Sequence, residues 1–490
     1  MMGRGELAML ARVAAQGPGK MAQGLLRRTE RLAPEALGAL QLMRASELVQ
    51  HAVAKVPYYR EHFPQDLPQR FDMATWRALP LLTREAVREE RAALQSSAPP
   101  LGHLGQGEAH SSGSTGRHVT VSQDRAALGV NSALSERGHA WHGRDTRLRC
   151  AVIRAEIDGM RRPGLSWGAG GGGLHLLDIH TPVREQLEWL LERAPDYLST
   201  YATNASALIE EAARAGVRWP GLRQVMTFGE VLAPEARARC LEVWGVPLVD
   251  GYSSVELGHL AQECPLHSLS VPDGSLAPHV TAPSESAHRA PVDSARSQIA
   301  PLSATPRYHV AAEQVLFEVL REDGSACAPG ETGRVVVTSL HNFVMPLIRY
   351  ELGDYATLGE PCECGRGLPV LTRVDGRARG LLRLRSGDVL WPRFASNILG
   401  RELPIRQFRM VQTGYVEFRL ELVSVPLTDR QVARLRSLVL SVLKRHLGEE
   451  PQLELAYRTS IPRSAGGKFE DFISEVAEPR AARPKPRTPG

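Results

Sequence analysis

The stretch from Gln186 to Val249 constrains the fold of this chain most, because helical and extended segments alternate along it. Apolar residues recur at three and four spacings in the segments expected to be helical, and short apolar runs lie between them. The expected helices cover 186–193, 205–213 and 234–244, and the expected strands cover 224–227 and 247–249. Such alternation is typical of an α/β layer architecture with parallel strands. We therefore predict the α/β class.

The flanking segments add helices before this region and strands after it. Residues 1–60 have a largely helical pattern, and Thr83 is the predicted N-cap of a further helix. Two apolar runs, 315–320 and 333–339, predict antiparallel strands connected through a turn at Asp323-Gly324. The sheet is therefore expected to be mixed, with parallel and antiparallel parts.

The sequence also predicts domain boundaries. Residues 266–306 are dominated by Ser, Pro, Ala and His without a sustained period, so we expect a disordered insertion there. A boundary near 374–379 separates residues 1–375 from a smaller α+β unit, 376–477. The Pro/Arg-rich tail over 478–490 is expected to be disordered.

Composition excludes several classes of protein. The 490-residue chain is 43% hydrophobic and carries a net charge of only +5, from 59 basic and 54 acidic residues. This balance is that of an ordinary globular protein and gives no footprint for nucleic acid or an acidic membrane surface. We find no signal peptide and no membrane-length apolar run, and six cysteines are too few for a disulfide scaffold. We therefore expect a cytoplasmic protein.

One glycine-containing loop points to phosphate. The loop consists of Ser111, Ser112, Gly113, Ser114, Thr115 and Gly116. Its glycines allow a tight turn that presents backbone N–H groups, and its hydroxyls suit the oxygens of a polyphosphate. It lacks the spacing of a P-loop, and small-residue runs are often only flexible loops. The loop by itself leaves both interpretations open.

Five short motifs in a fixed order carry a resemblance to a known family. They are Ser111–Gly116, Gly229-Glu230, Tyr252–Glu256, Arg349–Asp354 and Gly466-Gly467-Lys468. In this order the chain resembles the adenylate-forming superfamily, and in particular its branch of phenylacetate–CoA ligase-like and other aryl-CoA ligases. The resemblance covers roughly residues 40 to 475 and depends on the motifs as a set. It implies a large N-terminal adenylate-forming domain and a small, mobile C-terminal lid domain.

The resemblance implies roles around a nucleotide. The loop Ser111–Gly116 would hold the β- and γ-phosphates of ATP, and Glu256 would be a Mg²⁺ ligand, a hard oxygen for a hard cation. Tyr252 would lie on or beside the adenine. Asp354 would accept both ribose hydroxyls, since its two oxygens match a vicinal diol. The resemblance further implies contacts with ATP or AMP for Gly229, Glu230, Asp250, Ser253 and Arg377.

Lys468 is the implied catalytic cation. The chain has only five lysines, so a lysine in a glycine-containing loop asks for a reason. In the family this lysine bridges the substrate carboxylate and the α-phosphate, where a compact cation suits the phosphoryl transition state. The family's hinge residue is usually aspartate or lysine, whereas this chain has Arg379, which leaves the hinge residue open.

Three cysteines and one histidine form a candidate zinc site. Cys264, Cys362 and Cys364 follow the Cys…Cys-x-Cys-Gly-Arg pattern of the same branch, and one histidine would complete a Cys₃His set typical of structural zinc. His267 is nearest in sequence, whereas His309 matches the family's position once the insertion is removed. We favour His309. The alternative is three reduced cysteines near a surface loop.

The implied function is an ATP-dependent aryl-acid–CoA ligase that works through an acyl-AMP intermediate. Its substrate would be a small aromatic acid of the phenylacetate, benzoate or anthranilate type, as used in secondary metabolism. Phe228, Gly251, Tyr252 and a glycine-rich loop would line its pocket, and Gly168–Gly173 is expected to be a mobile loop. Two alternatives stay open: transfer of the acyl group to a carrier protein or amine, and a non-catalytic nucleotide-binding protein. The sequence does not decide between a monomer and a homodimer.

Overall fold

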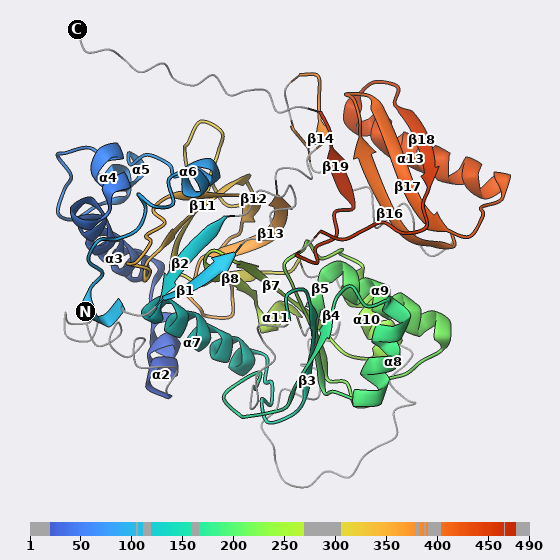
Figure 1. The fold of residues 1–490 in the computed structure, drawn as a ribbon, viewed down its shortest axis with the longest axis horizontal. Helices are drawn as coiled ribbons and strands as arrows, with labels where there is room; N and C mark the ends of the chain where they lie inside the picture. The colour runs from blue at the N-terminus through green and yellow to red at the C-terminus, as the bar shows by residue number, and fades with distance from the viewer. Residues whose placement is uncertain are drawn as a thin grey trace. The chain divides into compact units, whose positions relative to one another are not determined.

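The computed structural model describes residues 20–103, 106–110, 119–157, 166–268, 305–377, 382–386, 389–390, 403–464 and 466–476. The chain divides into two compact units (Figure 1). The first is Met1–Gly376 together with Ser464–Lys468, and the second is Arg377–Arg463 together with Phe469–Gly490. The predicted phosphate loop Ser111–Gly116, the hinge position Arg379 and the tail 478–490 lie outside the described residues.

Helices open the first unit, as the apolar periodicity predicts. They are α2 (Lys20–Thr29), α3 (Pro34–Lys55), α4 (Pro57–His62), α5 (Met73–Arg77) and α6 (Arg84–Glu89), followed by the 3₁₀ turn η1 (Leu101–His103). Thr83 is the N-cap of α6, since its side chain accepts a hydrogen bond from the backbone N–H of Ala86. This cap confirms the predicted helix start.

One large mixed sheet forms the centre of the first unit. Among the described residues the strand order is β10-β11-β12-β13-β9-β8-β7-β6-β5-β3-β4. The parallel strands are β3 (Cys150–Arg154), β4 (Leu174–Asp178), β5 (Tyr197–Tyr201), β6 (Gln224–Phe228) and β7 (Leu248–Ser254). The remaining strands are β8 (Gly258–Glu263), β9 (Tyr308–Val310), β10 (Val315–Leu320), β11 (Thr332–Ser339), β12 (Tyr350–Leu358) and β13 (Val370–Arg377). Antiparallel pairing of β7–β8, β8–β9, β9–β13, β10–β11 and β11–β12 makes the sheet mixed, as expected.

Helical crossovers connect β4 to β5, β5 to β6 and β6 to β7, and such crossovers allow these strands to run in the same direction. The crossover helices are α8 (Val183–Arg193), α9 (Ala202–Ala215) and α10 (Ala236–Trp244), and α7 (Arg125–Trp141) precedes β3. Apolar faces of α8, α9 and α10 pack into one buried cluster with β3, β5 and β6. Gly245 ends α10 in the left-handed conformation, at the position that the sequence predicts. The predicted α/β class is confirmed.

A hairpin flanks the predicted phosphate loop. Strands β1 (Gln106–His110) and β2 (Thr120–Asp124) pair antiparallel, with His110 opposite Thr120. The sequence places Ser111–Gly116 between these two strands.

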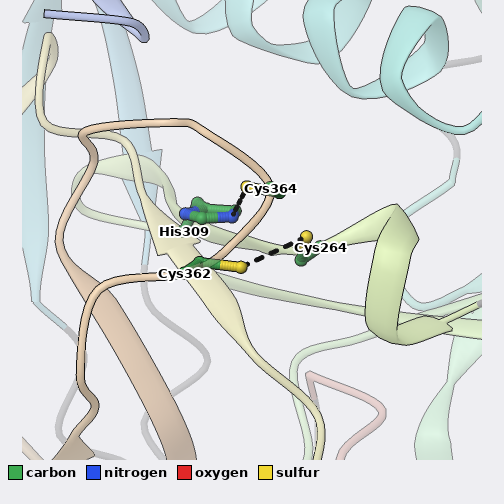
Figure 2. A group of neighbouring side chains, drawn as sticks. All are labelled: Cys264, His309, Cys362 and Cys364. Carbon is green, nitrogen blue, oxygen red and sulfur yellow. Dashed lines mark hydrogen bonds between the residues drawn. The ribbon is translucent and has the colours of Figure 1, made fainter.

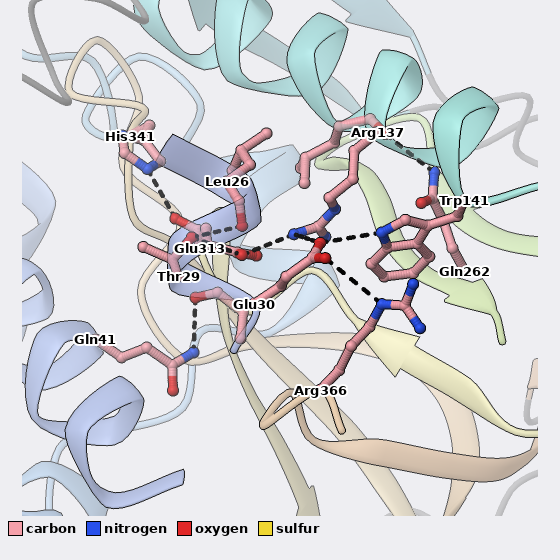
Figure 3. Close-up of polar contacts among 12 residues, drawn as sticks. Leu26, Thr29, Glu30, Gln41, Arg137, Trp141, Gln262, Glu313, His341 and Arg366 are labelled. Carbon is pink, nitrogen blue, oxygen red and sulfur yellow. Dashed lines mark hydrogen bonds and ion pairs between the residues drawn. The ribbon is translucent and has the colours of Figure 1, made fainter. Parts of the chain in front are cut away.

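Buried charges fasten α2 to α7 and the sheet (Figure 3). Arg137 donates to Glu313 Oε1 at 2.7 Å, and its Nη1 lies 3.9 Å from Glu30 Oε2. The Trp141 indole donates to the same Glu30 oxygen at 3.0 Å. The Arg366 guanidinium covers the Trp141 ring at 4.2 Å and lies 3.7 Å from Glu30 Oε1. We call Glu30, Arg137, Trp141, Glu313 and Arg366 the helix network.

The second unit is a small α+β domain. Its four-stranded sheet has the order β18-β17-β16-β19, and β14 (Leu382–Arg383) pairs with β15 (Val389–Leu390). The sheet strands are β16 (Ile405–Gln412), β17 (Glu417–Ser424), β18 (Gln452–Tyr457) and β19 (Phe472–Ser474). Leu435, Val439 and Leu443 on α13 (Asp429–Leu447) are buried in one cluster with these strands. The predicted small domain of strands and one long helix is therefore present.

One predicted boundary is wrong by a few residues. The insertion was expected to begin at Leu266, but Pro265–Ser268 forms the short helix α11, fixed by hydrogen bonds from His267 N and Ser268 N to the Cys264 carbonyl. The rest of the insertion up to residue 304 lies outside the described residues. Within the described part of the chain, no helix is long and apolar enough to cross a membrane.

Candidate functional site

The carboxyl ends of β5, β6 and β7 bring several predicted residues to one edge of the sheet. Tyr201 pairs with Phe228, and Phe228 pairs with Gly251, so β5 and β6 end beside Gly251, and β7 continues to Ser254. Gly229-Glu230 and Tyr252 follow directly. Ligands of open α/β sheets bind outside the carboxyl ends of the strands. The predicted nucleotide residues therefore lie where the fold class favours a ligand.

Gly229 and Glu230 shape the backbone at this edge. Gly229 has a φ of +76°, and a Cβ there would lie 3.4 Å from the Tyr201 ring and 3.6 Å from Lys468 Cε. Glycine adopts this conformation without strain, and it keeps the space open. The Glu230 carboxylate accepts hydrogen bonds from the backbone N and the hydroxyl of Thr203, at 2.8 and 2.6 Å. Glu230 therefore fixes the start of α9.

The Lys468 turn is seated at the same edge. The segment Ser464–Lys468 groups with the first unit, although the expected domain limits assigned it to 376–477. The turn is closed by a hydrogen bond from Lys468 N to the Ser464 hydroxyl at 3.1 Å, and Tyr201 Oη donates to the Gly466 carbonyl at 2.8 Å. These contacts bring the predicted lysine close to Gly229.

Gly467 lets the turn pack closely against the first unit. Its φ is +76°, and a Cβ would lie 2.8 Å from Ile179 Cγ2 and 3.0 Å from the Ala155 Cβ. A side chain at this position would meet both strain and collision. The second glycine of the Gly-Gly-Lys motif is therefore required by the geometry of the turn.

The adenine and ribose candidates are in direct contact. Tyr252 on β7 donates to the Asp354 Oδ2 on β12 at 2.7 Å, across 102 positions of sequence. The Tyr252 ring is buried and meets Phe317 edge to face at 6.4 Å. The sheet therefore brings Tyr252 and Asp354 into contact, although they belong to separate sequence motifs. Ser253 follows Tyr252 on β7 and pairs with His259.

Arg349 supports the Asp354 motif from behind. It is buried, has a φ of +49°, and donates to the Glu318 carboxylate at 3.2 and 3.3 Å. Its guanidinium also donates to the Arg77 and Leu79 carbonyls at 2.6 and 2.5 Å. A left-handed arginine is costly and persists only where its surroundings hold it. The arginine of this motif is therefore a structural anchor.

Glu256, the predicted Mg²⁺ ligand, is held by an arginine that the sequence analysis missed. Arg84 Nη1 lies 2.9 Å from Glu256 Oε1 and donates to Tyr350 Oη at 3.3 Å. The Glu256 side chain is only 2% exposed. A buried carboxylate is stable only with a partner, and Arg84 supplies the opposite charge. No sequence signal pointed to Arg84, since 172 positions separate the pair.

Asp250, a predicted nucleotide contact, is hydrogen-bonded within the protein. Its carboxylate accepts hydrogen bonds from Thr227 Oγ1 at 2.6 Å and from Tyr308 Oη at 3.0 Å. Burial raises the pKa of Asp250 to about 6, against the opposing effects of Arg237 and the Thr227 hydrogen bond. Both carboxylate oxygens of Asp250 therefore have hydrogen-bond partners within the protein, and its contact with the nucleotide stays a prediction.

The glycine run Gly168–Gly173 does not border this edge. Gly173 precedes β4 at the level of Cys150, Tyr197 and Gln224, which are the amino ends of their strands. The run is also packed, since Gly172 N donates to the Thr146 carbonyl at 2.8 Å. This run is therefore not the glycine-rich loop of a pocket at Phe228. The ring of Phe228 packs against that of Tyr201, with 5.0 Å between the ring centroids.

Two predicted nucleotide contacts are not described. Ser111–Gly116 lies outside the described residues, and Arg377 is placed only by its backbone at the end of β13.

The four candidate zinc ligands come together from three parts of the chain (Figure 2). Their ligand atoms all lie within 4.8 Å of one another. Cys264 Sγ is 3.9 Å from Cys362 Sγ, and Cys364 Sγ is 3.2 Å from His309 Nε2. Zn–S bonds of about 2.3 Å in a tetrahedron separate two sulfurs by about 3.8 Å. The donor set and its spacing fit a zinc ion.

The structure also separates the two candidate histidines. His309 belongs to the group with all three cysteines, whereas His267 groups with Cys362 and Glu363. Burial raises the pKa values of the Cys264 and Cys362 thiols. Burial is also the largest single effect on Cys364, but the hydrogen bonds with His309 and Arg366 and the charge of His309 together outweigh it and lower the pKa of Cys364 to about 5. This site favours at least one thiolate, the form that binds metals.

Comparison with known proteins supports the resemblance, although no family model matches the chain. The chain is 23% identical to the phenylacetate–coenzyme A ligase of Thermus thermophilus over 475 residues, covering 91% of this chain and 98% of that ligase. A 2-hydroxyisobutyryl-CoA ligase, solved in its postadenylation state, superposes with a TM-score of 0.68 at 18% identity, over 92% of both chains. The chain has the adenylate-forming fold. An anthranilate CoA ligase with anthranoyl-AMP matches with a TM-score of 0.50 at 15% identity, over 74% of this chain and 65% of that one. The predicted two-domain fold class is confirmed, and these similarities agree with the predicted resemblance.

Proposed function

We propose that the chain is an AMP-forming acid–CoA ligase that activates a small aromatic carboxylic acid. The observation that carries the proposal is the seating of the Lys468 turn on Tyr201 and beside Gly229. The same first unit presents the Tyr252–Asp354 pair. The relatives named above are all acid–CoA ligases, which agrees with this reaction class.

Each residue would serve one part of adenylation. The Lys468 ammonium would neutralise the charge that builds up between the substrate carboxylate and the α-phosphate. Asp354, held by Tyr252, would accept the ribose hydroxyls. The carboxylate would attack the α-phosphate and release pyrophosphate. The thiol of coenzyme A would then attack the acyl-AMP carbonyl and release AMP.

Two metal ions belong to the proposal. Glu256 is a carboxylate of the kind that Mg²⁺ prefers, and Mg²⁺ supplies charge neutralisation at the phosphates when bound. Arg84 offsets the Glu256 charge and holds it in place. Cys264, His309, Cys362 and Cys364 would hold a structural zinc ion, a closed set with no position left for a substrate.

The test is pyrophosphate release with Mg·ATP and a panel of acids, with and without coenzyme A. The panel contains phenylacetate, benzoate, anthranilate, a 2-hydroxy aliphatic acid and a fatty acid. Multiple turnovers that need both an aromatic acid and coenzyme A support the proposal. A preference for the aliphatic acids would overturn the aromatic assignment. Release of about one equivalent per chain, whether or not coenzyme A is present, would point to a carrier protein or an amine as acceptor.

A further inference from the structure

Four polar residues form a row across neighbouring strands of the first unit. Thr227 on β6 pairs with Asp250 on β7, and Glu263 on β8 pairs with Tyr308 on β9. Asp250 N donates to Glu263 Oε2 at 2.8 Å and connects the two pairs. We call Thr227, Asp250, Glu263 and Tyr308 the strand row. Each member comes from a different strand, so its side-chain contacts tie the four strands together.

The hydrogen bonds of the strand row form one connected network. Arg237 on α10 donates to both Glu263 oxygens, at 3.2 and 2.8 Å, and to Tyr308 Oη at 3.2 Å. The Tyr308 hydroxyl in turn donates a hydrogen bond to Asp250 Oδ2 at 3.0 Å. Thr227 donates to the second Asp250 oxygen at 2.6 Å. A buried polar network with all members paired holds each of them in one arrangement.

The row and the Cys₃His cluster lie on opposite faces of the same two strands. Side chains alternate between the faces of a strand. His309 follows Tyr308, and Cys264 follows Glu263, so each cluster ligand adjoins a row member that points the other way. The cluster therefore holds the end of β8 that carries Glu263 and the start of β9 that carries Tyr308.

At its other end the row borders the nucleotide edge. Thr227 precedes Phe228-Gly229, the segment beside Lys468. Asp250 precedes Gly251-Tyr252, whose tyrosine holds Asp354. A shift of the row would therefore move the residues proposed to contact ATP.

We propose that Glu263 and Tyr308 are positioning residues, through which the metal-loaded Cys₃His cluster sets the nucleotide affinity of the first unit. The inference rests on the proposed function, because it needs ATP to bind at the edge formed by Gly229 and Tyr252. Coupling of this kind requires a continuous set of contacts, and the row provides one. Neither residue touches the nucleotide; both act through Asp250.

Tyr308→Phe tests the row without disturbing the metal. The substitution keeps the ring and removes the hydroxyl that donates to Asp250 and accepts from Arg237. Arg237 keeps both of its contacts with Glu263, so ATP is expected to bind about tenfold more weakly, mainly through the lost hydrogen bond to the Asp250 carboxylate. Zinc content and the melting temperature with zinc bound are measured on the same protein. The matched control is Tyr355→Phe, which removes a hydroxyl that donates to Glu322 at 3.1 Å near the surface, and ATP affinity is expected to stay unchanged.

Zinc removal with a chelator tests the coupling. ATP affinity, measured by calorimetry, is expected to fall in the wild-type chain and to fall less in Tyr308→Phe, because both changes act through the same contacts. Full additivity, unchanged ATP affinity in both, or a chain that binds no zinc would overturn the proposal. Where chelation unfolds the chain, zinc-loaded Tyr308→Phe decides alone, and unchanged affinity overturns it. A wild-type chain that fails to bind ATP would overturn the proposed function as well, whereas binding without coupling overturns only this inference.

Discussion

Two buried charged networks adjoin the Cys₃His cluster, and they differ in what lies beyond them. The strand row continues from Glu263 and Tyr308 into the strand ends of β6 and β7. The helix network meets the cluster through Trp141, whose ring lies 5.8 Å from that of His309, and continues into α2 and α7 (Figure 3). Buried charged and aromatic side chains therefore connect the cluster both to the strands β6 and β7 and to the helices α2 and α7.

The networks also differ in how completely their polar atoms are paired. In the described residues, Arg137 Nε, Glu313 Oε2 and Arg366 Nε of the helix network are buried without a hydrogen-bond partner. The carboxylates of Asp250 and Glu263 in the strand row have protein donors on both oxygens. Burial of charge alone thus says little about function. In our proposal the two networks differ in role because they join different elements.

The largest expected effect is a loss of stability when the helix network is broken. Arg137→Met removes the arginine that pairs with Glu313 and leaves Glu30 with Arg366 alone, so the free energy of unfolding should fall by about 3–5 kcal/mol. Denaturant unfolding measures it. The double substitution Arg137→Met with Glu313→Leu removes both charges and should recover most of the loss. An ATP affinity that drops in the folded single variant would contradict the separation of the two networks.

The next effect is on chemistry at the nucleotide edge. Lys468→Ala should lower acid-dependent pyrophosphate release about 10²–10³-fold, as expected for removal of one charge that stabilises the transition state. Its melting temperature should stay near that of the wild type. Lys444→Ala is the matched control, because this lysine lies on the exposed side of α13 and pairs with Glu450. Equal rates for the two variants would remove Lys468 from the reaction.

A smaller effect is expected at Gly229. Gly229→Ala forces a side chain into a left-handed backbone next to Tyr201, at a cost of about 1–2 kcal/mol. Gly216→Ala is the control, since Gly216 has a φ of +63° with open space around it. Both variants should lose similar stability in thermal melts, and only Gly229→Ala should also lose pyrophosphate release. Loss of activity in both would show that the effect is not local to the edge.

The most gradual expected effect is a pH dependence from the strand row, spread over about two pH units. Burial raises the folded-state pKa of Asp250 from 3.8 to about 6, so between these values the folded chain holds a proton that the unfolded chain releases. This group therefore lowers stability as pH rises through that window, by at most about 1.4 kcal/mol per pH unit. The difference in unfolding free energy between wild type and Asp250→Asn, followed from pH 4 to 7, isolates it. A flat difference would mean that Asp250 is ionised throughout.

Local sequence signals predicted the elements well, for physical reasons that act over a few residues. The Thr83 cap and the end of α10 at Gly245 both depend on neighbours in the chain. The limit of the insertion at Leu266 was missed because the four residues of α11 are too few to show a period. The order of the motifs likewise predicted the fold, but it did not predict which residues of different motifs contact each other.

The sequence by itself determined the α/β class, the order of elements and the set of candidate residues, because periodicity, caps and turn glycines are written locally. Tertiary structure alone decided the partners. It placed Arg84 on Glu256, turned Asp250 into the protein, grouped His309 with the three cysteines and put Gly168–Gly173 at the far ends of the strands. These outcomes depend on strand register and on pairs such as Tyr201 and Gly466, 265 positions apart. Contacts over such separations form only when the whole sheet closes, so no local pattern contains them.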